Sequence, residues 1–151
     1  MLLVIGSSNT DLVIGTPHLP AAGETILGKN FFINPGGKGA NQAVAAARLG
    51  GRVKFVCKTG LDIFGNEAIQ HFQNEGIDIS SLLTDSSSPS GVALITVDDR
   101  GENTIVVASG ANAKPVREKL PPHSGATNWA GNLNAVLGIL RPLPEPEMDE
   151  R

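Results

Sequence analysis

The chain has 151 residues, about the length of one domain with a single core, and its 40% apolar and 18% charged residues are typical of a globular protein. Its net charge of −3, with no basic block, argues against bulk binding to nucleic acid or to an anionic membrane surface. The single cysteine, Cys57, excludes an internal disulfide framework. The apolar runs are too short to cross a bilayer and none resembles a leader peptide, so we expect a cytoplasmic protein with no membrane partner.

The first 113 residues alternate between strand and helix patterns. Continuous apolar runs are typical of strands covered on both faces, whereas small apolar residues at helical spacing, followed by glycine, indicate a helix and its end. In chain order, the patterns predict strands at 2–6, 11–16, 25–34 and 52–58, and helices at 40–50 and 66–74.

Two further strands are expected at 91–98 and 103–109, joined as a hairpin by residues 99–102. Strands that alternate with helices predict an α/β fold with a mostly parallel sheet and flanking helices. The hairpin and the half-polar segment 25–34 do not suit the inside of such a sheet. We therefore expect them in a small flanking β layer.

Residues 114–151 differ in composition, since they hold six of the ten prolines and end in the acidic, proline-spaced PLPEPEMDER. Such spacing favours an extended tail. One short helix is predicted within it, at 128–140, although two internal glycines weaken that helix. We therefore expect residues 1–113 to form the folded part and 114–151 to be poorly ordered.

The stretch NPGGKGANQA, residues 34–43, is the most informative one. Gly36, Gly37 and Gly39 lie between a strand and a helix, where backbone N–H groups and Lys38 can approach a polar ligand. Lys38 and Asn41 are three residues apart and share one face of the first helical turn. The Walker and dinucleotide-binding patterns do not match here. A turn that merely packs tightly remains the alternative.

A second polar cluster, GSSNTD, follows the first strand at residues 6–11. Ligands of open α/β sheets bind beyond the carboxyl ends of strands. Asn9 and Asp11 are two residues apart, so in an extended backbone they point to the same side. An amide and a carboxylate match the hydroxyls of a sugar, but ordinary turn and capping chemistry is an equally good explanation.

With the blocks PAAGET, KTGLDIFG and SGVALITVDDRGENTIVVASGANA, these motifs closely resemble the N-terminal half of ribokinase-type members of the phosphofructokinase-B family of carbohydrate kinases. The resemblance covers residues 1–113. It implies a Rossmann-like α/β domain with a β-sheet lid at about 11–16, 26–34, 91–98 and 103–109. In such kinases, lids of two subunits also pack together as a homodimer.

The resemblance also assigns roles to residues of the two clusters. Asn9 and Asp11 would hydrogen-bond the hydroxyls of ribose or a similar sugar, and Gly36 and Gly37 would form the hinge of the lid. The remaining sugar contacts would come from Gly37, Lys38 and Asn41, and from two lid residues, Ile95 and Val107.

The family's activity is transfer of the γ-phosphoryl of ATP to the 5-hydroxyl of ribose, with Mg²⁺ as cofactor and K⁺ as activator. The Asn-x-x-Glu and Gly-Ala-Gly-Asp motifs that serve ATP, Mg²⁺ and catalysis are absent from the 151 residues. We therefore expect no catalytic or metal-binding residue in this chain, and no activity of the chain alone. The abrupt change after Ala113 indicates a truncated or frame-shifted gene. The alternatives are an inactive sugar-binding or lid-dimerising fragment, and a remnant that does not fold stably.

Overall fold

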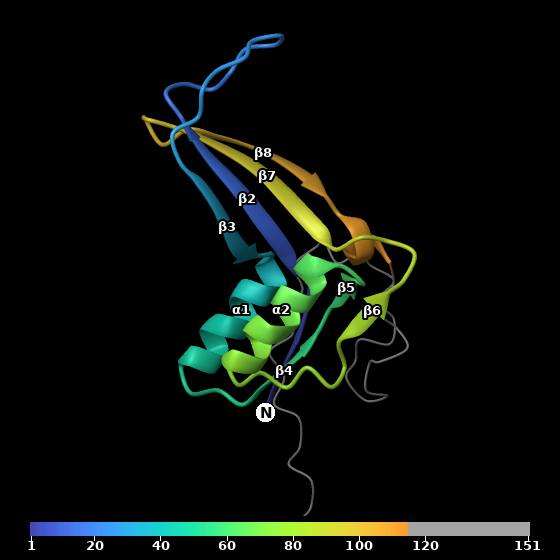
Figure 1. Cartoon of the computed structure of the whole chain (residues 1–151). Coiled ribbons are helices and arrows are strands. Elements are labelled where there is room, and N and C mark those ends of the chain that lie inside the picture. Colours follow the sequence, from blue (N-terminus) through green and yellow to red (C-terminus); the bar gives the residue numbers. More distant parts are fainter. Residues whose placement is uncertain (115–151) are drawn as a thin grey trace, which may run out of the picture.

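The computed structural model describes residues 1–114, in which two parts are distinguished. In one part, helices α1 (Lys38–Arg48) and α2 (Ile63–Asn74) cover short parallel strands; in the other, a four-stranded sheet projects away from the helices (Figure 1). The expected tail beyond Lys114 and its helix at 128–140 lie outside the described residues. The alternation of helix and strand confirms the predicted α/β class.

The helix-covered part holds two parallel strand pairs, as expected of the larger sheet. Strand β1 (Leu2–Ile5) pairs with β4 (Val53–Val56), and β5 (Lys58–Gly60) pairs with β6 (Leu83–Asp85). The prediction of one strand at 52–58 was wrong, because the chain changes partner at Cys57, whose carbonyl accepts from Leu83 N–H at 3.0 Å. The short strand β6 was not predicted.

Both helices start earlier than predicted, and both are followed by a glycine in the left-handed region. Helix α1 (Lys38–Arg48) starts directly after the glycine turn, and Gly50 follows it with φ of 84°. Helix α2 (Ile63–Asn74) starts three residues before the predicted position, since Asp62 caps it by accepting from Gly65 N–H at 2.8 Å. Neither helix is long and apolar enough to cross a membrane.

The core lies between the helices and β1 and β4. The rings of Phe55 and Phe72 meet edge to face with centroids 5.1 Å apart, and Cys57 is fully buried in the same cluster. Burial raises the pKa of the Cys57 thiol. This core fixes where the next strand, β2 (Asn9–Thr16), begins, because only residues 6–8 separate it from β1.

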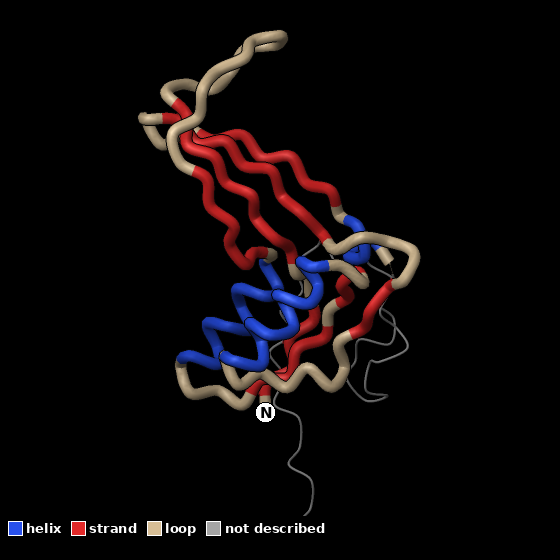
Figure 2. The backbone as a smooth tube through the Cα atoms, viewed as in Figure 1, coloured by secondary structure: helices blue, strands red, loops and turns tan. Residues whose placement is uncertain are grey.

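The projecting sheet, here called the lid sheet, has the order β3-β2-β7-β8. Its strands are β2 (Asn9–Thr16), β3 (Phe31–Gly36), β7 (Gly91–Asp98) and β8 (Asn103–Ala108). Strands β7 and β8 form the predicted hairpin, while β2 and β7 run parallel. A 3₁₀ turn, η1 (Gly110–Ala113), leads the chain back to the helix-covered part (Figure 2).

The predicted lid segment at 26–34 was partly wrong, because the strand covers residues 31–36 instead. Gly15 N–H donates to Asn30 O at 2.9 Å and Gly15 O accepts from Lys29 N–H at 2.8 Å. Two residues thus oppose one at Gly15, which is how a β-bulge interrupts a ladder. Regular pairing ends there, and residues before Phe31 continue as the loop beyond the end of β2 (Figure 1).

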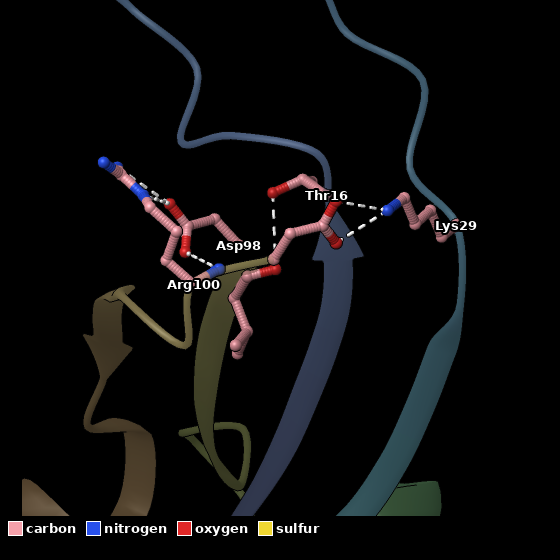
Figure 3. Close-up of polar contacts among 6 residues, drawn as sticks. Thr16, Lys29, Asp98 and Arg100 are labelled. Atoms are coloured by element: carbon pink, nitrogen blue, oxygen red, sulfur yellow. Dashed lines mark hydrogen bonds and ion pairs between the residues drawn. The ribbon is translucent and has the colours of Figure 1, made fainter.

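Polar contacts hold the far end of the lid sheet together (Figure 3). Lys29 Nζ lies 2.6 Å from both carboxylate oxygens of Asp99, and Thr16 Oγ1 donates to Val97 O at 3.4 Å. The buried Asp98 carboxylate accepts from the backbone N–H groups of Arg100 and Glu102. These contacts shape the β7–β8 turn and attach the loop before β3 to it.

Candidate sugar-binding site

A cavity of about 490 Å³ lies between the first turn of α1 and one face of the lid sheet. Its walls come from five segments: the turn before β2, strand β2 itself, the start of α1, and strands β7 and β8. The lining residues are Ser7, Asn9, Asp11, Gly37, Lys38, Asn41, Ala93, Ile95, Ile105, Val107 and Ser109.

Strand alternation selects the residues on this face of the lid sheet. Asp11 pairs with Ala93 across β2 and β7, and Ala93 pairs with Val107 across β7 and β8. Asn9 and Ile95 follow at alternate positions of the same strands, so their side chains point to the same side. The lid sheet thereby offers polar groups from β2 and an apolar wall from β7 and β8.

Asp11 is the carboxylate of this cavity. Partial burial raises its pKa above the ordinary value, and within residues 1–114 it accepts no hydrogen bond from the protein. A half-buried carboxylate that has lost water without gaining donors favours a ligand that brings donors. Hydroxyl groups are such donors.

Gly36 is needed beside Asp11, although it does not line the cavity. A Cβ built on Gly36 would lie 2.2 Å from Asp11 Oδ2. Any side chain there would therefore displace the carboxylate. Gly36 is the last residue of β3 and pairs with Asn9.

Gly37 allows the sharp passage from β3 into α1. Its φ is 95°, and a Cβ on it would lie 2.7 Å from Ser7 O and 2.8 Å from Asn9 N. This close approach brings the start of α1 against the turn before β2, where Ala40 N–H donates to Ser7 O at 3.0 Å. The two motifs found in the sequence therefore meet at one place.

The first turn of α1 supplies the donors of the site. Lys38 and Asn41 both line the cavity, as their spacing of three residues predicts. Among the side chains of residues 1–114, none caps the N-terminus of α1. Lys38 and Asn41 thus share one cavity with the Asp11 carboxylate, and the cavity is large enough for a small polar ligand.

Of the eight site residues proposed from the sequence, seven line this one cavity, and Gly36 is the exception. Sequence reasoning did not name Ser7, Ala93, Ile105 and Ser109. Strand alternation was a usable signal for two of them, because Ala93 is two residues before Ile95 and Ile105 two before Val107. Ser7 and Ser109 carry no such signal.

The described residues do not offer a metal site. Within residues 1–114 no three His, Cys, Asp or Glu side chains lie close enough together to hold an ion. Mg²⁺ prefers carboxylates and phosphate oxygens in octahedral geometry. This part of the chain therefore does not fit Mg²⁺ by itself.

Comparisons with known proteins agree with this geometry. Ribokinase of Haemophilus influenzae is 49% identical over 112 residues, which are 74% of this chain and 37% of that protein. Ribokinase of Bacillus subtilis is 45% identical over 150 residues, 99% of this chain and 49% of that protein. The chain thus spans about a third to a half of the length of these relatives.

Solved structures show the same arrangement. Ribokinase of Giardia lamblia matches with a TM-score of 0.69 and 40% identity, over 74% of this chain and 34% of that one. Ribokinase of Arabidopsis thaliana, complexed with ribose and ATP, matches with a TM-score of 0.66 and 33% identity, over 73% of this chain and 36% of that one.

The family comparison covers more of the chain than the motifs did. The model of the pfkB family of carbohydrate kinases matches residues 1–140, past Ala113, where the motif resemblance ended. Since this match includes most of the chain, the chain belongs to the pfkB family of carbohydrate kinases.

Proposed function

We propose that this chain carries the sugar-binding half of an ATP-dependent ribose kinase. The observation that carries the proposal is the Asp11 carboxylate, which is half-buried, has no hydrogen-bond donor from the described residues 1–114, and shares one cavity with Lys38 and Asn41. One structural neighbour, Arabidopsis ribokinase, was solved with ribose and ATP.

The cavity matches both the hydroxyl groups and the apolar C–H groups of a pentose. Vicinal hydroxyls donate to the Asp11 carboxylate, while Lys38 and Asn41 donate to hydroxyl oxygens. The apolar side chains of Ile95, Ile105 and Val107 face the C–H groups of the ring. Hydrogen bonds to charged groups contribute about 1.5–3 kcal/mol each, so the polar side of the cavity accounts for most of the affinity.

The proposed reaction of the whole enzyme moves the γ-phosphoryl of ATP to the 5-hydroxyl of ribose. Such transfer depends on positioning and on neutralising charge, which Mg²⁺ supplies when bound. The described residues hold and orient the acceptor, and they offer no group of ligands for Mg²⁺. We therefore propose that the chain alone, in the ATP-rich cytoplasm, binds sugar without phosphorylating it.

A homodimer through the lid is part of the proposal. The face of the lid sheet away from the cavity exposes large apolar side chains, among them Ile33, Leu94 and Val106. Exposed apolar strands at a sheet with open edges favour association with a partner. A fragment that only dimerises is the second candidate function, which the same surface favours.

Titration of the full 151-residue chain with ribose in a calorimeter tests the proposal. Ribose should bind, and Lys38→Met should weaken binding about tenfold or more, because a charged donor is lost. Lys29→Met is the matched control, since Lys29 pairs with Asp99 at the far end of the lid sheet.

The outcomes separate the candidates. Absence of ribose binding by a chain that circular dichroism shows to be folded would contradict the proposal and leave a dimerising fragment. Equal losses of affinity in Lys38→Met and Lys29→Met would remove Lys38 from the site. With labelled ATP, Mg²⁺ and K⁺ added, the chain alone should yield no ribose 5-phosphate above a boiled control.

A further inference from the structure

A buried asparagine, Asn112, lies outside the cavity and forms a hydrogen bond with Asn9, one of the polar residues that line the cavity. Asn112, in η1, is fully buried and lies more than 100 residues from its partners in the sequence. Its Oδ1 accepts from Ser8 N–H at 3.1 Å, while its Nδ2 donates to Ser8 O at 2.9 Å and to Asn9 Oδ1 at 2.8 Å. The return of the chain after β8 is thus joined to the start of β2.

The surroundings keep this amide in place. Ala111 N–H donates to Pro89 O at 2.8 Å, and Asn112 N–H donates to Ser109 O at 3.0 Å. A Cβ on Gly91 would lie 2.2 Å from Asn112 Nδ2 and 2.4 Å from Asn9 Oδ1. The pair of amides therefore fits only because β7 starts with glycine.

The hydrogen bond from Asn112 determines which end of the Asn9 amide can still bind a ligand. An asparagine side chain offers an acceptor oxygen at one end and two N–H donors at the other. Because Asn9 Oδ1 already accepts from Asn112, the oxygen is engaged and the N–H donors remain. Asp11, two residues further on the same face, only accepts when ionised.

We propose that Asn112 is a positioning residue for the sugar site: it fixes the Asn9 amide so that Asn9 donates to a sugar hydroxyl beside the acceptor Asp11. The inference rests on the proposed sugar-binding function. It goes beyond that function because Asn112 does not line the cavity. An amide is required at position 112, since one side chain must both accept from Ser8 N–H and donate to Asn9.

Ribose calorimetry on the full chain tests the positioning role through coupling. Asn112→Ala should weaken ribose binding about three- to tenfold, the worth of one neutral hydrogen bond. The same change in an Asn9→Ala background should have no further effect. Ser90→Ala is the matched control, because it removes buried hydrogen bonds to Asp62 and Gly60 at the base of β7 without touching Asn9.

A second variant distinguishes a loss of ribose affinity at the site from a general loss of stability. Asn9→Asp keeps an acceptor for Asn112 but has no N–H donors, so its midpoint of urea unfolding should stay closer to wild type than that of Asn112→Ala, while ribose affinity falls. Equal loss of ribose affinity in Asn112→Ala and Ser90→Ala would overturn the positioning role. Full additivity of Asn112→Ala with Asn9→Ala would overturn it as well.

Spectroscopy of the ligand-free chain separates this inference from the proposed function. The two Asn9 side-chain N–H signals should be sharp and distinct in the wild type and should shift and broaden in Asn112→Ala but not in Ser90→Ala. Unchanged Asn9 signals in Asn112→Ala would contradict the inference whether or not ribose binds. A wild type that binds no ribose yet shows the expected change would contradict the proposed function alone.

Discussion

Two aspartates of the chain show how environment assigns a role to a residue. Burial alone would raise the pKa of Asp62, but hydrogen bonds from Ser90 and from backbone N–H groups, including Gly65, outweigh it and lower that pKa. Burial raises the pKa of Asp11, and no protein donor opposes it within residues 1–114. Asp62 is therefore satisfied by the fold, whereas Asp11 is left for a ligand.

Asp11→Asn should weaken ribose binding about tenfold or more, because neutral hydrogen bonds replace charged ones. Since hydroxyls donate to the ionised form, affinity in the wild type should be full above the raised pKa of Asp11 and fall as the pH drops through it. The variant should lose this pH dependence. Calorimetry over a pH series checks both effects, with Asp99→Asn as control; a pH-independent wild type would contradict the role of Asp11.

At the scale of single residues, local spacing predicted which side chains share a side, whereas the resemblance to the carbohydrate kinases assigned their roles and added Ile95 and Val107. The two-residue spacing of Asn9 and Asp11 and the three-residue spacing of Lys38 and Asn41 place each pair on one side. Asn112 had no such signal, because its partners are more than 100 residues away. Contacts of this kind depend on how the chain returns, which local patterns do not encode.

At the scale of elements, the sequence predicted whether a segment is helix or strand better than it predicted the residues at which the segment begins and ends. Strand β7 (Gly91–Asp98) was predicted to the residue, since it is a continuous apolar run between turn residues. The start of α2 was missed because capping by Asp62 extends the helix before its periodic part. The loop before β3 was read as strand because the bulge at Gly15 depends on pairing rather than on composition.

The junction between β3 and α1 depends on Gly37. Gly37→Ala should lower the free energy of unfolding by several kcal/mol. Alanine would have to adopt the left-handed φ of 95° that glycine has here, which costs about 1–2 kcal/mol, and its Cβ would make contacts below 3 Å. Gly50→Ala is a matched control, because its φ is 84° but no atom lies within 4 Å of the added Cβ. Urea unfolding measures both, and equal losses would show that close approach at Gly37 is unimportant.

At the scale of the molecule, one sheet presents two surfaces with different tasks. One face lines the cavity proposed to bind sugar, and the opposite face exposes apolar side chains such as Val106, which is 68% exposed. Two adjacent residues of β8 lie on the two faces, since Val107 lines the cavity and Val106 points away from it. This division depends on the strand register, which pairs Ala93 with Val107 and Leu94 with Val106.

Val106→Lys should weaken self-association of the full chain, because a charge on the exposed face opposes burial against a partner. Light scattering over a range of concentrations should show a dimer for the wild type and a shift toward monomer for the variant. Ribose affinity should stay unchanged in Val106→Lys. A wild type that stays monomeric at high micromolar concentration would contradict association through the lid.

The central claim is that the cavity between α1 and the lid sheet binds ribose. The most direct test is a ribose titration followed by backbone and side-chain NMR of the full chain. Shifts should concentrate at Asp11, Gly37, Lys38, Asn41, Ile95 and Val107 and be absent at the far end of the lid sheet, around Lys29 and Asp99. A folded chain whose spectrum does not change with ribose, or changes only outside this cavity, would contradict the account.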